Sequence, residues 1–164
     1  MHTFHHETES EHLKKIRFAL NVITPDNFNV LKYEIHELAR ANLTYCLAVG
    51  NQIVSNAWDQ KPYSRTYARL CKFLGDQDTL RFNQSKGESK KGPNDFLRHV
   101  LGLVENVTGL DRKLISGAEE NVSSYPANYE KYTKEPYHRR ERMFGNVIFL
   151  GDLYLEGLIN VQAI

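Results

Sequence analysis

Residues 139–154 read RRERMFGNVIFLGDLY, a basic cluster that becomes an apolar run with helical spacing. Five apolar side chains follow at steps of four, three, four and four, which places them on one face of a helix: Met143, Val147, Leu150, Tyr154 and Leu158. Phe144, Ile148 and Leu155 form a second apolar face. A helix that is apolar on most of its circumference has neighbours on both sides, so this segment predicts an inner helix of a stack.

Two glycines, Gly145 and Gly151, lie within this predicted helix. Each costs about 1 kcal/mol of helix stability relative to alanine. We therefore expect another backbone to approach the helix closely at these positions.

Helical spacing recurs along most of the chain. Apolar residues at steps of three and four predict helices over residues 13–23, 28–38, 43–58, 63–75 and 96–107. Helix pairs of about thirty residues are typical of helical solenoids. We predict an all-α fold, a right-handed α-α superhelix of the HEAT-repeat kind with about three repeats present.

This pattern also predicts how the chain is divided. Residues 1–10 form a flexible tail and residues 11–164 a helical-repeat domain. Within the domain we expect repeat one over 11–40, repeat two over 41–75 with a helix at 94–108, a connector over 110–137, and the start of repeat three over 138–164.

The first turn of the array carries a helix-start signal. Thr24 suits an N-cap, Pro25 the first helical position, and Asp26 the first turn of the helix that follows. A polar segment between Gly75 and Pro93 predicts a loop.

Composition argues against several classes of function. Lysine and arginine number 21 and aspartate and glutamate 20, so the net charge of +1 indicates neither a general polyanion binder nor an acidic protein. No apolar run is long enough to span a bilayer. Cys46 and Cys71 lie in apolar helical patterns and are interpreted as reduced core residues.

The sequence contains no catalytic constellation that we recognise. His36 and His99 are isolated, and the N-terminal histidines lack a second ligand group at helical spacing. We expect no enzyme activity, no cofactor and no metal site.

Three stretches, taken together, resemble one known family. They are LKKIRFALNVITPDNF over residues 13–28, YARLCKFL over residues 67–74, and the run over residues 139–154. In this order they are similar to the middle domain of eukaryotic translation initiation factor 4G, a helical-repeat scaffold. Val22 departs from the usual lysine and Asp152 from the commoner glutamate. The family domain has about five helix pairs, and this chain stops during the third.

The resemblance implies a cytoplasmic scaffold for translation initiation that binds and stimulates a DEAD-box RNA helicase of the initiation factor 4A type. Other initiation factors are further candidate partners. The candidate helicase contacts lie at the first and third turns of the array: Asn21, Thr24, Pro25, Phe28, Arg139, Arg140, Asn146 and Asp152. Each has a structural alternative, such as starting a helix for Pro25 and core packing for Phe28.

A second candidate partner is mRNA or other single-stranded RNA. Basic and aromatic residues interleave before the last helix, which suits phosphate contacts and base stacking: Lys131, Tyr132, Lys134, Tyr137, Arg139, Arg140 and Arg142. The alternative for this segment is a solvated connector. Two other functions stay open, an RNA-binding repeat platform and a related helicase-binding domain of nuclear cap-binding, splicing or mRNA decay factors.

Overall fold

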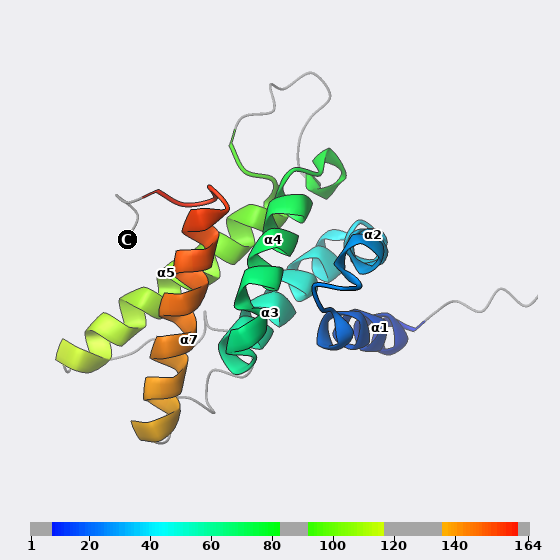
Figure 1. Cartoon of the computed structure of the whole chain (residues 1–164). Coiled ribbons are helices and arrows are strands. Elements are labelled where there is room, and N and C mark those ends of the chain that lie inside the picture. The colour runs from blue at the N-terminus through cyan, green and yellow to red at the C-terminus, as the bar shows by residue number, and fades with distance from the viewer. Residues whose placement is uncertain (1–7, 83–91, 117–135, 161–164) are drawn as a thin grey trace, which may run out of the picture.

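The computed structural model describes residues 8–82, 92–116 and 136–160, without side chains for 107–116, Pro136, Tyr137 and Arg139. Throughout these ranges the regular elements are helices (Figure 1). They are α1 (Glu9–Val22), α2 (Phe28–Ala39), α3 (Leu43–Asp59), η1 (Lys61–Tyr63), α4 (Ser64–Gly75), η2 (Asp78–Leu80), α5 (Asp95–Ser116) and α7 (Pro136–Leu155). The prediction of an all-α fold is confirmed.

The helices form two layers of a helical-repeat array. In one layer α3 lies between α1 and α5, and in the other α4 lies between α2 and α7. Figure 1 shows α4 and α7 side by side, with α1 and α2 at the opposite end of the molecule from α5. Because α3 contacts all the other α-helices of the described ranges, it is the centre of the fold. The division into repeats stays a prediction.

The first helix begins earlier than predicted. The Thr8 side chain accepts a hydrogen bond from the backbone N–H of Glu11, and the Glu11 carboxylate accepts one from the N–H of Thr8. This capping box starts α1 at Glu9, inside the stretch predicted as a tail, because it satisfies two otherwise unpaired backbone donors. The rest of the predicted tail, residues 1–7, lies outside the described residues.

The first turn also differs from the prediction. Helix α2 begins at Phe28 with Asn27 as its N-cap residue, so Thr24 does not cap it and Pro25 lies in the turn before it. The Asn27 side chain accepts a hydrogen bond from the N–H of Thr24 at 2.7 Å and donates one to the carbonyl of Val22 at 2.8 Å. The asparagine therefore closes the turn with local hydrogen bonds, as its short amide side chain often does.

The predicted end of α5 and the predicted loop before it both differ from the structure. Helix α5 continues through Gly109 to Ser116, since one glycine weakens a helix by only about 1 kcal/mol and does not end it. The predicted loop after Gly75 begins with the short helix η2, whose Leu80 is fully buried. Residues 83–91 and most of the predicted connector, 117–135, lie outside the described ranges.

The prediction for the faces of α7 was wrong as well. Arg142, Asn146, Phe149 and Leu153, at steps of four, three and four, point into the protein. Val147, with 66% of its surface exposed, lies on the outer side with other apolar residues. Helix α7 contacts α3, α4 and α5, and no described helix lies on its outer side, so the predicted neighbours on that side stay a prediction.

Candidate functional site

The first turn is tied to the centre of the fold by buried hydrogen bonds. The Asn56 amide donates to the carbonyl of Leu20 at 3.3 Å and to Oδ1 of Asn21 at 3.0 Å. The Tyr67 hydroxyl donates to the same Leu20 carbonyl at 2.9 Å. Burial raises the pKa of this hydroxyl, the Asn56 hydrogen bond opposes the rise, and Tyr63 adds to it slightly. Helices α3 and α4 therefore both hold the carbonyl end of α1 in place.

The predicted contact residues of the first turn differ in accessibility. Asn21 and Pro25 are exposed, and Thr24 is half-buried. Phe28 is only 4% exposed and packs in the core, so we withdraw it as a direct contact. Arg69 lies over its ring, with the guanidinium carbon 4.5 Å from the ring centroid. The apolar spacing of α2 had already indicated core packing as the alternative for this phenylalanine.

Exposed apolar side chains next to the first turn were missed by the sequence analysis. Phe18 on α1 and Val30 on α2 are 69% and 73% exposed, and Val22 is 38% exposed. Phe18 and Val22 are four residues apart and therefore share a helix face. The one available signal was Val22 itself, an apolar residue at a position where the family resemblance predicts lysine.

The candidates at the third turn lie on α7. Arg140 is exposed, Asp152 is half-buried, and Asn146 is only 2% exposed on the inner face. Arg139 belongs to α7, but its side chain is not among those that the structure describes. The structure therefore does not gather the predicted contacts into one pocket, because α4 separates the first turn from α7.

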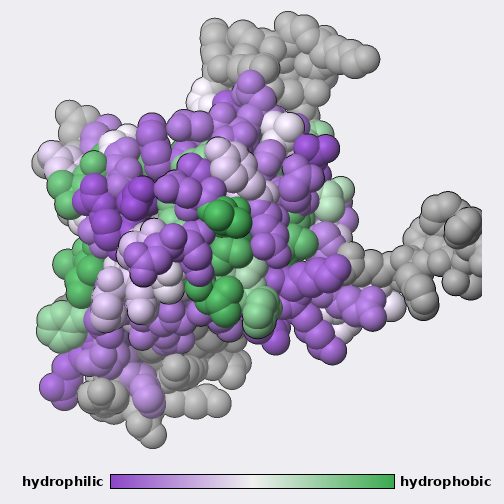
Figure 2. Space-filling view, turned by 45° about the vertical axis from the view of Figure 1, so that its right-hand side comes forward, coloured by the Kyte–Doolittle hydropathy of each residue, from purple (hydrophilic) through white to green (hydrophobic). Residues whose placement is uncertain are grey.

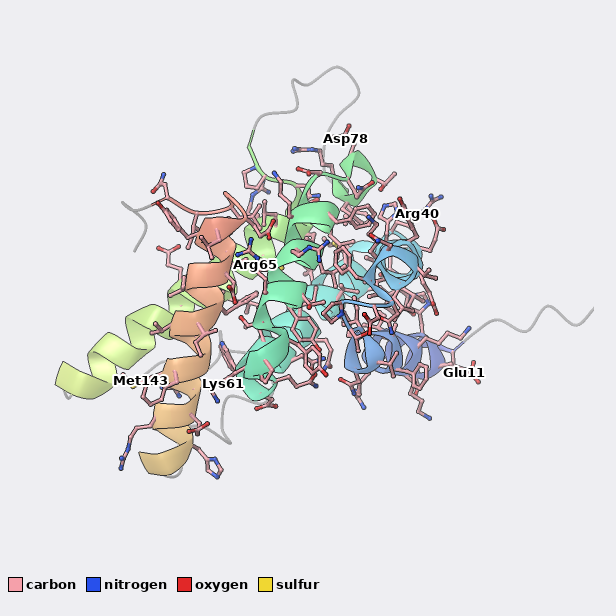
Figure 3. All side chains as sticks on the ribbon, viewed as in Figure 1. Glu11, Arg40, Lys61, Arg65, Asp78 and Met143 are labelled. Atoms are coloured by element: carbon pink, nitrogen blue, oxygen red, sulfur yellow. The ribbon has the colours of Figure 1, made fainter. Side chains whose placement is uncertain are left out.

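Two ion pairs connect the ends of α7 to η1 and α4; their basic residues, Lys61 and Arg65, are labelled in Figure 3. Lys61 Nζ lies 2.7 Å from Glu141 near the start of α7, and Arg65 Nε lies 2.9 Å from Glu156 just beyond its end. Between them, Gly145 faces α3: a Cβ there would lie 2.8 Å from the Cα of Trp58. This confirms the predicted close approach at Gly145. The same prediction for Gly151 was not confirmed, because no atom of another described segment lies within 4 Å of its Cβ position.

The predicted RNA contacts are only partly described. Lys131, Tyr132 and Lys134 lie outside the described ranges, as do the side chains of Tyr137 and Arg139. Arg142 is fully buried, so its guanidinium cannot reach an RNA phosphate in this arrangement. Among these residues Arg140 alone has a described, exposed side chain.

A second set of basic and aromatic residues, not predicted from the sequence, lies where α2 meets α4. Its members come from α2 and α4, and we call it the cation–aromatic cluster: Phe28, Lys32, Tyr33, Arg69, Lys72 and Phe73. The available signal was the spacing of the arginines and the lysine of α4, which places them on one side of that helix. On the face shown in Figure 2, hydrophobic side chains interrupt a mainly hydrophilic surface.

The two cysteines are buried as free thiols. Burial, with a smaller contribution from Asp95, raises the pKa of Cys46 to about 12, and burial also raises the pKa of Cys71. Both thiols are therefore protonated at neutral pH and are poor nucleophiles.

The two histidines considered in the sequence are bonded to neighbouring helices. His36 Nε2 lies 2.6 Å from the Thr79 hydroxyl, and His99 Nε2 lies 2.8 Å from Oδ1 of Asn51. Burial lowers the pKa of both; for His36, Glu37 opposes this shift. In the part of the chain that is described, no three His, Cys, Asp or Glu residues are grouped to hold a metal ion. The described helices also include none with the length and hydropathy needed to cross a membrane.

Comparison with known proteins gives one consistent similarity. The chain is 26% identical over 151 residues to eukaryotic translation initiation factor 4 gamma 2 of mouse and of human, which covers 85% of this chain and 15% of those proteins. It is also 26% identical over 158 residues to a probable eukaryotic translation initiation factor 4 gamma homolog of Vairimorpha ceranae, covering 93% of this chain and 26% of that protein. No protein-family model matches the chain.

Proposed function

We propose that this chain, similar to part of the initiation factor 4 gamma proteins, is a non-catalytic scaffold that binds a DEAD-box RNA helicase of the 4A type in the cytoplasm. It would stimulate the helicase by stabilising one arrangement of the two helicase lobes, which is a shift of population rather than a chemical step. Other initiation factors are further partners under this proposal.

The observation that best supports the proposal is the first turn. It is exposed, it is held in shape by Asn27 and Asn56, and it is flanked by exposed Phe18 and Val22. A preorganised surface loses little conformational entropy on binding, so more of the contact energy appears as affinity. Large apolar side chains at the centre of such a surface are suitable anchors.

The second contact region of this proposal is the start of α7. Arg140 is exposed there and is followed by the ion-paired Glu141. An exposed arginine suits a carboxylate on the partner because its guanidinium can bind both oxygens. Since α4 lies between the two regions, a partner that contacts both must extend across α4.

Calorimetric titration with a 4A-type helicase tests the proposal. We expect Phe18→Asp to lower the affinity by at least about 2 kcal/mol, because it places a charge in an apolar contact. Reversing the charge of Arg139 and Arg140 together has a similar expected effect. Arg40→Glu is the matched control, since Arg40 is exposed at the end of α2 that is remote from the first turn. Unchanged affinity in both folded test variants would reject this function.

Two alternative functions remain. A helicase-binding domain of nuclear cap-binding, splicing or decay factors would bind a different helicase, and the similarity to initiation factor 4 gamma proteins favours the translation branch. An RNA-binding platform needs a basic surface with accessible aromatic rings.

A further inference from the structure

The cation–aromatic cluster is built around three rings that the two helices bring together. Lys32 Nζ lies 5.0 Å from the centroid of the Phe73 ring, 5.2 Å from that of Tyr33 and 5.5 Å from that of Phe28. Arg69 covers the Phe28 ring from α4. Tyr33 and Phe73 meet edge to face with their centroids 5.3 Å apart. The rings therefore hold both cations in place on the surface.

The charge around the cluster is positive. Arg69 and Lys72 are exposed and three residues apart on α4. On α2, Glu34 and Glu37 follow Lys32 by two and five residues, which places them roughly 200° and 140° around the helix from it. Two acidic groups adjoin the cluster. The Asp76 carboxylate is 3.9 Å from Lys72 Nζ, a length typical of a weak surface pair. Glu37 follows Tyr33 by four residues on α2 and forms an ion pair with Arg40 at 3.3 Å.

The cluster also offers an accessible ring. Tyr33 is 58% exposed, whereas Phe28, beneath Arg69, is 4% exposed. An exposed aromatic ring next to fixed cations can stack on a nucleobase while the cations bind the flanking phosphates. Arg69 can contribute in both ways, because a guanidinium supported on one aromatic ring can stack on a base through its other face.

We propose that the cation–aromatic cluster binds a short segment of single-stranded RNA, with a base stacked on Tyr33 and phosphates bound by Lys32, Arg69 and Lys72. An acidic protein segment would use the three cations but would leave the exposed ring without a role. This inference goes beyond the proposed helicase contact and does not depend on it, because none of the residues that bind RNA here is an assigned helicase contact.

Fluorescence anisotropy with a labelled twelve-nucleotide oligouridine tests the inference. We expect Tyr33→Ala to weaken binding about 5- to 100-fold, the loss of one stacked base. Tyr33→Phe keeps the ring and is expected to bind as the unchanged protein does. Arg69→Gln is expected to weaken binding and to reduce the slope of log affinity against log salt by about 0.7, one phosphate contact on a single strand. Arg17→Gln, on α1, is the control for loss of an exposed arginine outside the cluster.

Three outcomes would overturn the inference. One is that the unchanged protein does not bind oligouridine, and another is that Tyr33→Ala with the native melting temperature binds it as tightly as the unchanged protein does. Polyglutamate that competes as strongly as RNA would also overturn it. Helicase affinity measured on the same Tyr33→Ala protein separates the two proposals. Unchanged helicase affinity with weakened RNA binding supports this site, and loss of helicase affinity alone reassigns the cluster to the protein partner.

Discussion

Helices α4 and α7 lie side by side in one layer, but they differ in the side chains that they expose. Helix α4 exposes Arg69 and buries Leu70, as an ordinary amphipathic helix does. Helix α7 buries Arg142 and Asn146 and exposes Phe144. The exposed side of α4 is therefore charged, whereas that of α7 is largely apolar.

The difference follows from the neighbours of each helix. Helix α4 has α2 on one side and α7 on the other, with α3 and α5 beneath, so one narrow stripe of it meets solvent. Helix α7 has described neighbours on its inner side only. On that side it buries Phe149 and Leu153, and Gly145 lets the backbone of Trp58 approach. Burial in this array therefore follows position in the stack more closely than it follows hydropathy.

The largest effect is expected at the inner face of α7. Phe149 is fully buried, so Phe149→Ala should lower the free energy of unfolding by about 3–5 kcal/mol through lost burial and a cavity. Phe144→Ala, at a ring that is 60% exposed, should change it by less than about 0.5 kcal/mol. Urea unfolding of both variants, compared at constant m-value, measures the difference. Equal losses would show that the outer face of α7 is also packed.

A smaller effect separates the two glycines of α7. A Cβ at Gly145 would meet backbone atoms of Trp58, which cannot rotate away, so α7 must shift from α3. Overpacking of this kind costs about 1–3 kcal/mol and exceeds the roughly 1 kcal/mol that alanine adds in helix propensity. Gly145→Ala should therefore destabilise the protein on the order of 1 kcal/mol.

Gly151→Ala is the matched variant on the same helix. Its Cβ would enter open space, so it should stabilise the protein by about 0.5–1 kcal/mol through propensity alone. Thermal melts of the two variants should shift in opposite directions. A fall in melting temperature for both would contradict the outward placement of Gly151.

The sequence predicted α4 to within one residue, because its charged residues fall in one stripe: Arg65, Arg69 and Lys72. The spacing of Tyr67, Leu70 and Leu74 matched their burial. In α7 the apolar residues occur on all sides, so periodicity could not decide which face is inside. A single sequence also cannot show that Gly145 fits against Trp58 at the end of α3 while Val147 faces outward.

The candidate site, like the fold, was only partly predictable from the sequence. The first turn was located, but the N-cap position assigned to Thr24 is occupied by Asn27, whose side chain bonds back to Thr24 and Val22. Lys32 and Arg69 are 37 positions apart, and only the packing of α2 on α4 brings them to the same ring, that of Phe28. Contacts of that range leave no local pattern in the sequence.

The smallest effect concerns the charges that join the two helices. Arg65 is about half exposed, at 47%, and Glu156 is 17% exposed, so their ion pair is partly screened by water. A double-mutant cycle of Arg65→Gln and Glu156→Gln should give a coupling energy of about 0.2–1 kcal/mol. The coupling should fall when the salt concentration is raised from about 0.1 M to about 1 M, because the screening length shortens from about 10 Å to about 3 Å. A salt-independent coupling above about 2 kcal/mol would mean that charge pairs, and not the fit of the inner face against Trp58, hold α7 to the array.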